Sequence, residues 1–142
     1  MAGIKRTPAD AAFSDCVRER ASWKCEACNR DYSDNTRALD ASHYFGRRAY
    51  SVRFHPDNCF AHCMGCHNKF GENPDDFRAW AKERLGEGRI QILREIREDS
   101  NAGKLVKKNL KDVAKHYRGQ LKIMKAKRAD GKVGRIEFEG WL

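Results

Sequence analysis

Two Cys-x-x-Cys pairs constrain this chain of 142 residues more than any other feature of its sequence. A Cys-x-x-Cys turn directs two thiolates at one centre, and two such turns complete the tetrahedral shell that zinc prefers. The N-terminus lacks the apolar stretch of a signal peptide, and cytosolic thiols stay reduced, so disulfides are disfavoured. Cys16 and Cys59 are expected to be small buried residues. We therefore expect one structural zinc ion, with residues 29–62 inserted between its two pairs of ligands, Cys25, Cys28, Cys63 and Cys66.

Local signals predict a mixed α+β chain that is rich in helices. Thr7, Pro8 and Asp10 are typical of a helix N-terminus, and this helix should run to about Arg20. Residues 39–45 and 52–54 predict two short strands joined by a basic loop, with a turn at 55–58. The segment that carries the second cysteine pair is predicted to be helical. The remaining expected elements are this segment at 59–70, a helix that begins at Asn73, an amphipathic stretch at 90–97, a long helix at 104–128 and a strand or loose tail at 136–142.

The formal net charge of +9 points to a polyanionic partner, and DNA is the leading candidate. No apolar run approaches the roughly 18 residues of a membrane span, so no membrane partner is expected. The charge is unevenly distributed. Residues 1–103 carry 17 Lys and Arg against 16 Asp and Glu, whereas residues 104–142 carry 12 against 4. We therefore divide the chain into a domain at 1–103 and a basic helical extension at 104–142.

The helix predicted over 104–128 holds ten Lys or Arg and a single acid, Asp112. Exposed helices usually mix the two signs, so we expect this one to contact the DNA backbone in a salt-sensitive, sequence-independent way. Three arginines near the predicted hairpin suit a clamp on phosphates, and they equally suit a solvated strand edge that resists pairing. The residues expected to bind DNA are Arg47, Arg48, Arg53, Lys107, Lys108, Lys111 and Lys115.

Three polar residues accompany the cysteine pairs in the order His43, Asn58, His67, with His67 directly after Cys66. This order resembles the HNH nucleases, and the wording around it is more narrowly similar to the phage NinG/Rap recombination proteins. The similarity lies in Asp40-Ala-Ser-His43-Tyr-Phe-Gly-Arg and Cys66-His-Asn-Lys-Phe-Gly-Glu-Asn73, within roughly residues 13–99. The resemblance implies a small ββα-metal (HNH) core that is stapled by the zinc site and surrounded by helices.

The resemblance also assigns a role to each residue of the motif. His43 would accept the proton of the attacking water, which an imidazole can do near neutral pH. Asn58 would tie the loop together and orient His43. His67 would bind a catalytic Mg²⁺ or Mn²⁺ ion that stabilises the leaving oxygen and the charge on the phosphorus centre.

The second ligand of that catalytic ion stays open. Many HNH sequences place an acid or a histidine directly before the catalytic histidine, and here that position is Ser42, a poor ligand. Asp40 could reach the ion if a bulge re-aimed its side chain. His62 is the main alternative to Asp40, and His55 is a weaker one.

Together these features predict a metal-dependent DNA endonuclease that leaves 5′-phosphate ends and acts on branched or recombination-intermediate DNA. We expect a phage or prophage protein in the cytoplasm of a bacterial host cell. Symmetric cleavage of a four-way junction would need two active sites, so a homodimer stays open. The alternatives are a non-catalytic zinc-containing DNA-binding protein that assists recombination, and a restriction-type HNH endonuclease.

Overall fold

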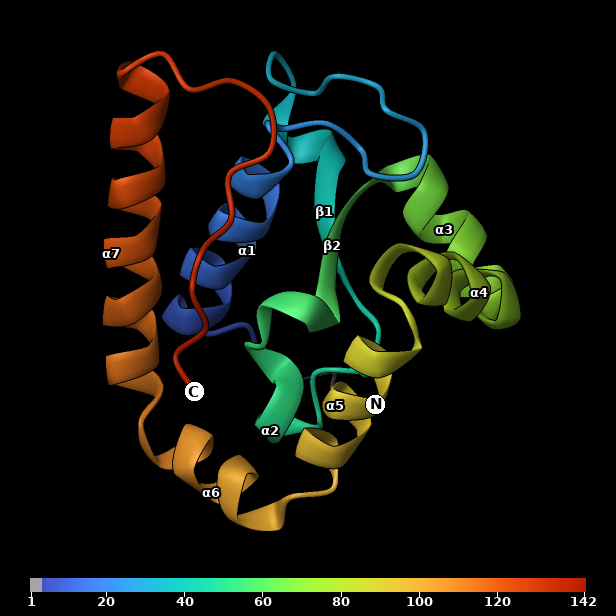
Figure 1. Cartoon of the computed structure of the whole chain (residues 1–142), viewed down its shortest axis with the longest axis vertical. Helices are drawn as coiled ribbons and strands as arrows, with labels where there is room; N and C mark the ends of the chain where they lie inside the picture. Colours follow the sequence, from blue (N-terminus) through green and yellow to red (C-terminus); the bar gives the residue numbers. More distant parts are fainter. Residues whose placement is uncertain (1–3) are drawn as a thin grey trace.

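A computed structural model describes residues 4–142 and shows a mixed α+β chain, mostly helical, with one two-stranded sheet. Helix α1, Pro8–Arg20, begins as predicted, because the Thr7 side chain and the Asp10 carboxylate form a reciprocal capping box. The long helix α7, Leu110–Ala129, packs along α1 (Figure 1). Its buried residues Val113 and Tyr117 join the core on that side.

The sheet pairs β1, Leu39–His43, with β2, Cys59–Cys63, in antiparallel register. Helix α3, Met64–Glu72, follows β2 directly, whereas a short helix and a 3₁₀ turn lie between the two strands (Figure 1). The predicted strand at 39–45 is therefore confirmed in its position.

The predicted strand at 52–54 is wrong, because residues 50–53 form the short helix α2, Tyr50–Arg53, whose Val52 and Arg53 are buried. The helix predicted over 59–70 is also wrong at its start, where β2 lies. All five residues of β2 are buried. A strand that is buried on both faces has no alternation of polar and apolar residues, so its sequence pattern does not separate it from a buried helix.

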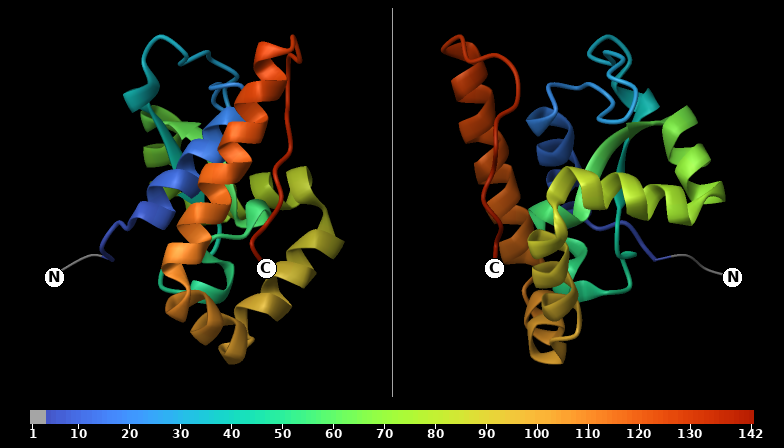
Figure 2. Two further views of the ribbon diagram at one scale, coloured as in Figure 1. Left: turned by 90° about the vertical axis from the view of Figure 1, so that its left-hand side faces the viewer. Right: turned by 45° about the vertical axis from the view of Figure 1, so that its right-hand side comes forward.

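Three further helices surround the sheet on the side opposite α1 and below it (Figures 1 and 2). The helix start predicted at Asn73 is confirmed, although the Asn73 side chain donates to the Lys69 carbonyl of α3 rather than capping the new helix. The helices are α4, Pro74–Leu85, α5, Glu87–Arg97, and α6, Ser100–Lys108, and two short 3₁₀ turns lie at η1, Thr36–Ala38, and η2, Pro56–Asn58.

The residues after α7 run back along α1 as an extended segment (Figure 2). Ile136 and Phe138 are buried, and the Ile136 amide donates to the Arg20 carbonyl at 3.2 Å. The hydroxyl of Tyr117 donates to the Phe54 carbonyl and accepts from the Trp141 amide, which ties α7 and the C-terminal segment to α2. The C-terminal segment is therefore packed rather than loose.

The expected boundary between residues 103 and 104 falls inside α6. Residues on its C-terminal side, among them Val106 and Val113, belong to the same core as α1 and the sheet. A cut at this point would remove buried side chains, and the two-domain division itself stays a prediction. None of the helices within residues 4–142 combines the length and the apolar composition that crossing a membrane requires.

Candidate functional site

The four cysteines of the two pairs meet at one point, with their sulfur atoms within 4.8 Å of one another. Cys25 and Cys28 come from the loop after α1, Cys63 ends β2, and Cys66 lies in the first turn of α3. Although burial raises the pKa of Cys63, hydrogen bonds from the Cys66 amide and the Tyr32 hydroxyl bring it down to about 6. Burial raises the pKa of Cys25 and Cys66, so a metal ion that bound all four sulfur atoms would displace protons from these two. The cluster can therefore hold a structural metal such as zinc.

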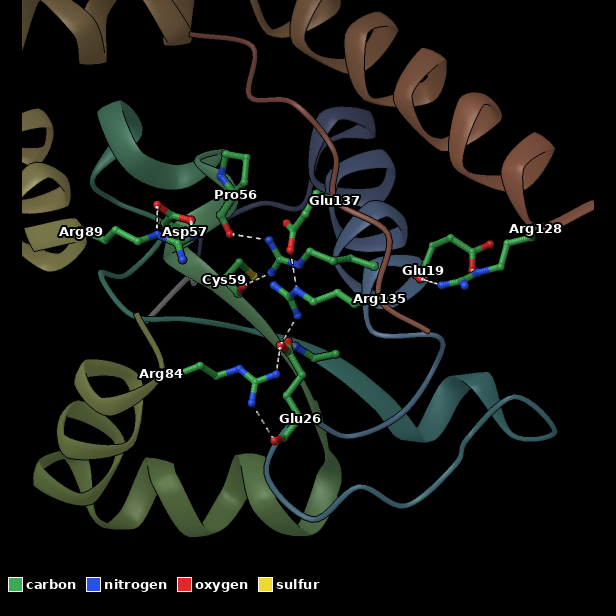
Figure 3. A network of polar contacts seen from close by, with 12 residues as sticks. Glu19, Glu26, Pro56, Asp57, Cys59, Arg84, Arg89, Arg128, Arg135 and Glu137 are labelled. Carbon is green, nitrogen blue, oxygen red and sulfur yellow. Dashed lines mark hydrogen bonds and ion pairs between the residues drawn. The ribbon is translucent and has the colours of Figure 1, made fainter. Parts of the chain in front are cut away.

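Glu26, inside the first cysteine pair, fastens this knuckle to three other parts of the fold (Figure 3). One of its carboxylate oxygens accepts from the Ala61 amide of β2 at 2.7 Å. The other accepts from Arg84 of α4 and from Arg135 of the C-terminal segment, each at 2.9 Å. The Glu26 side chain is only 2% exposed, so these contacts compensate the cost of burying its charge.

A pocket of about 240 Å³ brings Ser42 and His43 of β1 together with His67 of α3, the residue after Cys66. The Ser42 hydroxyl lies 2.6 Å from Nδ1 of His67 and links the strand to the helix. The rest of the lining comes from α3, α4 and the residues between them: Phe70, Gly71, Pro74 and Phe77. Two of the three motif residues therefore face one pocket with apolar walls.

The His43 ring is held on both sides. Its Nε2 lies 3.0 Å from the Arg53 carbonyl, and its Nδ1 lies 3.9 Å from the sulfur of Cys59, the residue opposite it in the sheet. If Nε2 carries the proton that it donates to the carbonyl, the lone pair of the ring is on Nδ1. Burial lowers the pKa of His43 to about 4, so the ring is neutral at pH 7.

Asn58 is completely buried, and its side chain closes the loop between the two strands. Its oxygen accepts from the Phe45 amide at 2.8 Å, while its nitrogen donates to the Phe45 carbonyl at 2.9 Å and to the Val52 carbonyl at 3.0 Å. Asn58 thereby fixes the backbone on either side of the loop that follows His43. It is a positioning residue, because its side-chain contacts are to the backbone.

The three candidates for a further metal ligand lie outside this pocket. Asp40 lies opposite His62 in the sheet. His62 is fully buried among aromatic rings, where burial lowers its pKa to about 4 and neither ring nitrogen has a hydrogen-bond partner within residues 4–142. The Nδ1 atom of His55 accepts a hydrogen bond from the Asp57 amide. In the described part of the chain, the four cysteines are the only group of three or more metal-binding side chains that converge.

Arg53, expected to clamp a phosphate, is fully buried and forms a two-point ion pair with Asp10 of α1. That expectation is wrong, because its guanidinium is enclosed and neutralised. Arg47 is half-buried and donates to the Ile4 carbonyl. The other candidates stay predictions, since each has an exposed side chain that nothing here tests: Arg48, Lys107, Lys108, Lys111 and Lys115.

Sequence reasoning missed the structural partners of the site. The sequence presents Ser42 only as a poor metal ligand, whereas its hydroxyl holds His67. Asp10 caps α1 as predicted, and it also neutralises Arg53, 43 positions away. The role of Glu26 could have been predicted, because an acid inside a Cys-x-x-Cys turn lies close to the elements that pack against that turn. No local pattern connects residues 10 and 53.

In a comparison with protein families, the model described as Bacteriophage Lambda NinG protein matches residues 6–127. The matched range contains both cysteine pairs, the pocket with His43 and His67, and most of α7. Curated proteins and solved structures gave no match.

Proposed function

This chain belongs to the NinG family, and we propose that it is a DNA endonuclease that acts in phage recombination. The observation that carries the proposal is the pocket in which His43 and His67 meet, on a β1, β2, α3 unit beside four convergent cysteines. This arrangement supports the resemblance to the HNH nucleases, which implies a base on the first strand and a second histidine at the start of the helix. Phage recombination also suggests branched DNA as the substrate.

The chemical step assigned to this chain is removal of a proton from water by His43. Its ring is neutral above a pH of about 4, so the form that accepts a proton is the dominant one at neutral pH. The hydrogen bond between Nε2 and the Arg53 carbonyl fixes the tautomer, so Nδ1, which also lies 3.9 Å from the Cys59 sulfur, is the nitrogen that would take the proton. Water activated in this way attacks phosphorus, and the bond to the 3′ oxygen breaks, which leaves a 5′ phosphate.

Two contacts keep this geometry in place. Ser42 holds the His67 ring across the pocket from the strand, and Asn58 holds the backbone of the loop that starts just after His43. Neither residue reacts. They limit the freedom of the groups that face the substrate, which is how positioning residues contribute to rate.

The pocket does not by itself complete a site for Mg²⁺ or Mn²⁺. Hard cations prefer oxygen ligands, and the pocket offers the His67 imidazole and the Ser42 hydroxyl but no carboxylate. Asp40, the nearest acid along β1, is outside the lining. We therefore assign no step to a divalent ion, and the dependence of cleavage on such an ion is a variable of the assay.

A non-catalytic DNA-binding role is the second candidate, and two observations favour it. The low pKa of His43 makes it a weak base, and the donors for a catalytic ion are incomplete. In this role the cysteine cluster and the basic helices would serve binding alone.

One assay separates the two candidates. Plasmid, linear duplex and four-way-junction DNA are incubated with the protein in EDTA, Mg²⁺ or Mn²⁺, and the wild type is compared with His43→Ala and with His116→Ala, a histidine outside the pocket. We expect cleavage by the wild type and by His116→Ala, with 5′-phosphate ends, and none by His43→Ala. No cleavage of any DNA under any metal would favour the binding role. Discrete fragments from a long duplex would indicate a restriction-type enzyme.

A further inference from the structure

Four basic side chains line a groove of about 300 Å³: Arg48, Arg97, Lys104 and Lys107. We call it the basic groove. They come from the loop before α2, from the end of α5 and from α6, so residues 48 and 107 of the sequence share one surface. All four side chains are exposed.

The cations of the basic groove have no acidic partner. Within residues 4–142, none of the four forms an ion pair with a carboxylate within 4.0 Å, whereas Arg84, Arg89 and Arg128 elsewhere all do. The only acid in the lining is Asp99, and its carboxylate accepts the Asn101 and Ala102 amides at the start of α6. The groove therefore concentrates positive charge that the fold itself does not neutralise.

Packing holds these cations in a fixed arrangement. Arg97 lies over the Phe45 ring at 4.8 Å, and Lys107 lies over the Tyr50 ring at 5.5 Å. The Ser51 hydroxyl donates to the Arg97 carbonyl, and α6 passes so close to α2 that a side chain at Gly103 would begin 3.6 Å from the Ser51 amide nitrogen. Cations stacked on aromatic rings lose less freedom on binding than freely moving ones.

One residue of the loop after His43 contacts the basic groove. Phe45, on which Arg97 stacks, is the residue whose amide and carbonyl are both held by Asn58, and it lies two positions after His43. A strand that crossed from the pocket along this loop would pass from His43 to the four cations.

We propose that the basic groove binds the backbone phosphates of the DNA strand next to the site of cleavage. This rests on the proposed function. It adds Arg97 and Lys104 to the residues that contact DNA, and it makes Arg48 and Lys107 part of one binding surface rather than separate contacts. Phosphate is the favoured ligand because the groove offers guanidinium and ammonium donors that suit phosphate oxygens.

The test measures the affinity for duplex and four-way-junction DNA without divalent ions at several salt concentrations. The full-length double variant Arg97→Gln/Lys104→Gln is compared with Lys24→Gln/Arg37→Gln, which removes the same charge from exposed positions between α1 and β1. Because each phosphate contact contributes about 0.9 to the slope of log K against log salt, we expect the groove variant to lose nearly 2 from this slope. We expect its affinity near 0.1 M salt to fall at least about tenfold, and the control to change little.

Equal losses of DNA affinity in the two double variants would show that only net charge matters, and would overturn the proposal that the basic groove binds DNA. An unchanged groove variant, or stronger binding of the wild type to phosphatidylserine vesicles than to DNA, would overturn it as well. Zinc content and thermal midpoint confirm that both variants are folded. Binding is measured separately from cleavage, so a protein that binds through the groove but cuts no DNA would contradict the nuclease proposal and leave the groove standing.

Discussion

The Ser42 hydroxyl lies 2.6 Å from Nδ1 of His67, so a buried residue of the first strand fixes the ring of an accessible residue on the helix. Ser42 stands where many HNH sequences have a metal ligand. Its hydroxyl is a poor ligand, but it can hold one nitrogen of His67 and leave Nε2 free to face the pocket.

Removal of the Ser42 hydroxyl should therefore release the His67 ring without unfolding the protein. We expect Ser42→Ala to cost about 1 kcal/mol of stability and to slow DNA cleavage about 10- to 100-fold. Ser42→Thr, which keeps the hydroxyl, is the matched control. The chemical shifts of the His67 ring nitrogens provide a readout that does not depend on activity, and unchanged shifts in Ser42→Ala would contradict the contact.

Loss of one partner of the buried pair of Asp10 and Arg53 should destabilise the fold strongly, since it leaves a buried charge uncompensated. We expect Asp10→Ala to lower the free energy of unfolding by about 3–5 kcal/mol. Asp75→Ala, which breaks the exposed pair with Arg78, should cost less than about 1 kcal/mol. Urea unfolding of both variants checks this, and similar midpoints would show that the buried pair contributes no more than a surface one.

The cysteine cluster should bind one zinc ion per chain and release it only when a ligand is removed. Cys63→Ser should lose the metal and its cooperative unfolding transition, because folding and metal binding are coupled. Cys16→Ser should keep the metal, because its thiol is buried against the Tyr117 carbonyl, away from the cluster. Elemental analysis after dialysis against EDTA is the measurement. A wild-type protein that is folded without zinc would contradict the assignment of these cysteines to a structural zinc site.

The depressed pKa of His43 predicts a loss of stability in mild acid. Its folded value is about 4, whereas an unfolded histidine has a pKa of about 6.5, so the unfolded chain binds the proton more tightly. Stability should therefore fall as the pH drops from about 6.5 to 4, by roughly 2–3 kcal/mol from this residue. Burial is the largest cause of the lowered pKa, and it outweighs the Arg53 carbonyl and Asp10, which favour the charged ring. The charges of Arg47 and Arg53 act in the same direction as burial.

Urea unfolding of the wild type and of His43→Gln, measured between pH 7 and pH 4.5, isolates this contribution. Other groups titrate in both proteins, including the cysteines, so the informative quantity is the difference between them. The wild type should lose more stability than the variant over this range. Parallel curves would mean that His43 titrates at its ordinary pKa.

The segment after residue 103 should be needed for folding. Tyr117 is fully buried and Val106, Met124 and Phe138 belong to the shared core, so a chain that ends at residue 103 would expose the apolar face of α1. We expect the truncated chain to be unfolded and to show no cooperative thermal transition. If it instead melts cooperatively and keeps its metal, then residues 1–103 are an independent domain, as the charge distribution suggests.

The parts of the fold that could be predicted are those with strong local signals. The capping box at Thr7, the proline after Asn73 and the two cysteine pairs each act within a few residues, and the structure places all of them as expected. The second strand could not be located, because β2 is buried throughout and its sequence suits a helix equally well.

Contacts between residues that are distant in the sequence explain what could not be predicted at the site. Arg53 carries the charge of a phosphate-binding residue, and only the three-dimensional fold brings Asp10 to it. His62 has the chemistry of a ligand, but the aromatic rings of α3 and α4 enclose it. Whether a basic or titratable side chain faces solvent depends on which distant residues pack around it, and a single sequence does not contain that information.

Single-turnover cleavage of an end-labelled four-way junction, with protein in excess, tests directly whether this chain is a nuclease whose base is His43. We expect the wild type to cut the junction and His116→Ala to cut it at the same rate. We expect His43→Ala to be slower by at least about 100-fold with unchanged DNA affinity. Equal rates for the wild type and His43→Ala, or binding of the junction by the wild type with no cleavage at any divalent-ion concentration, would contradict this assignment.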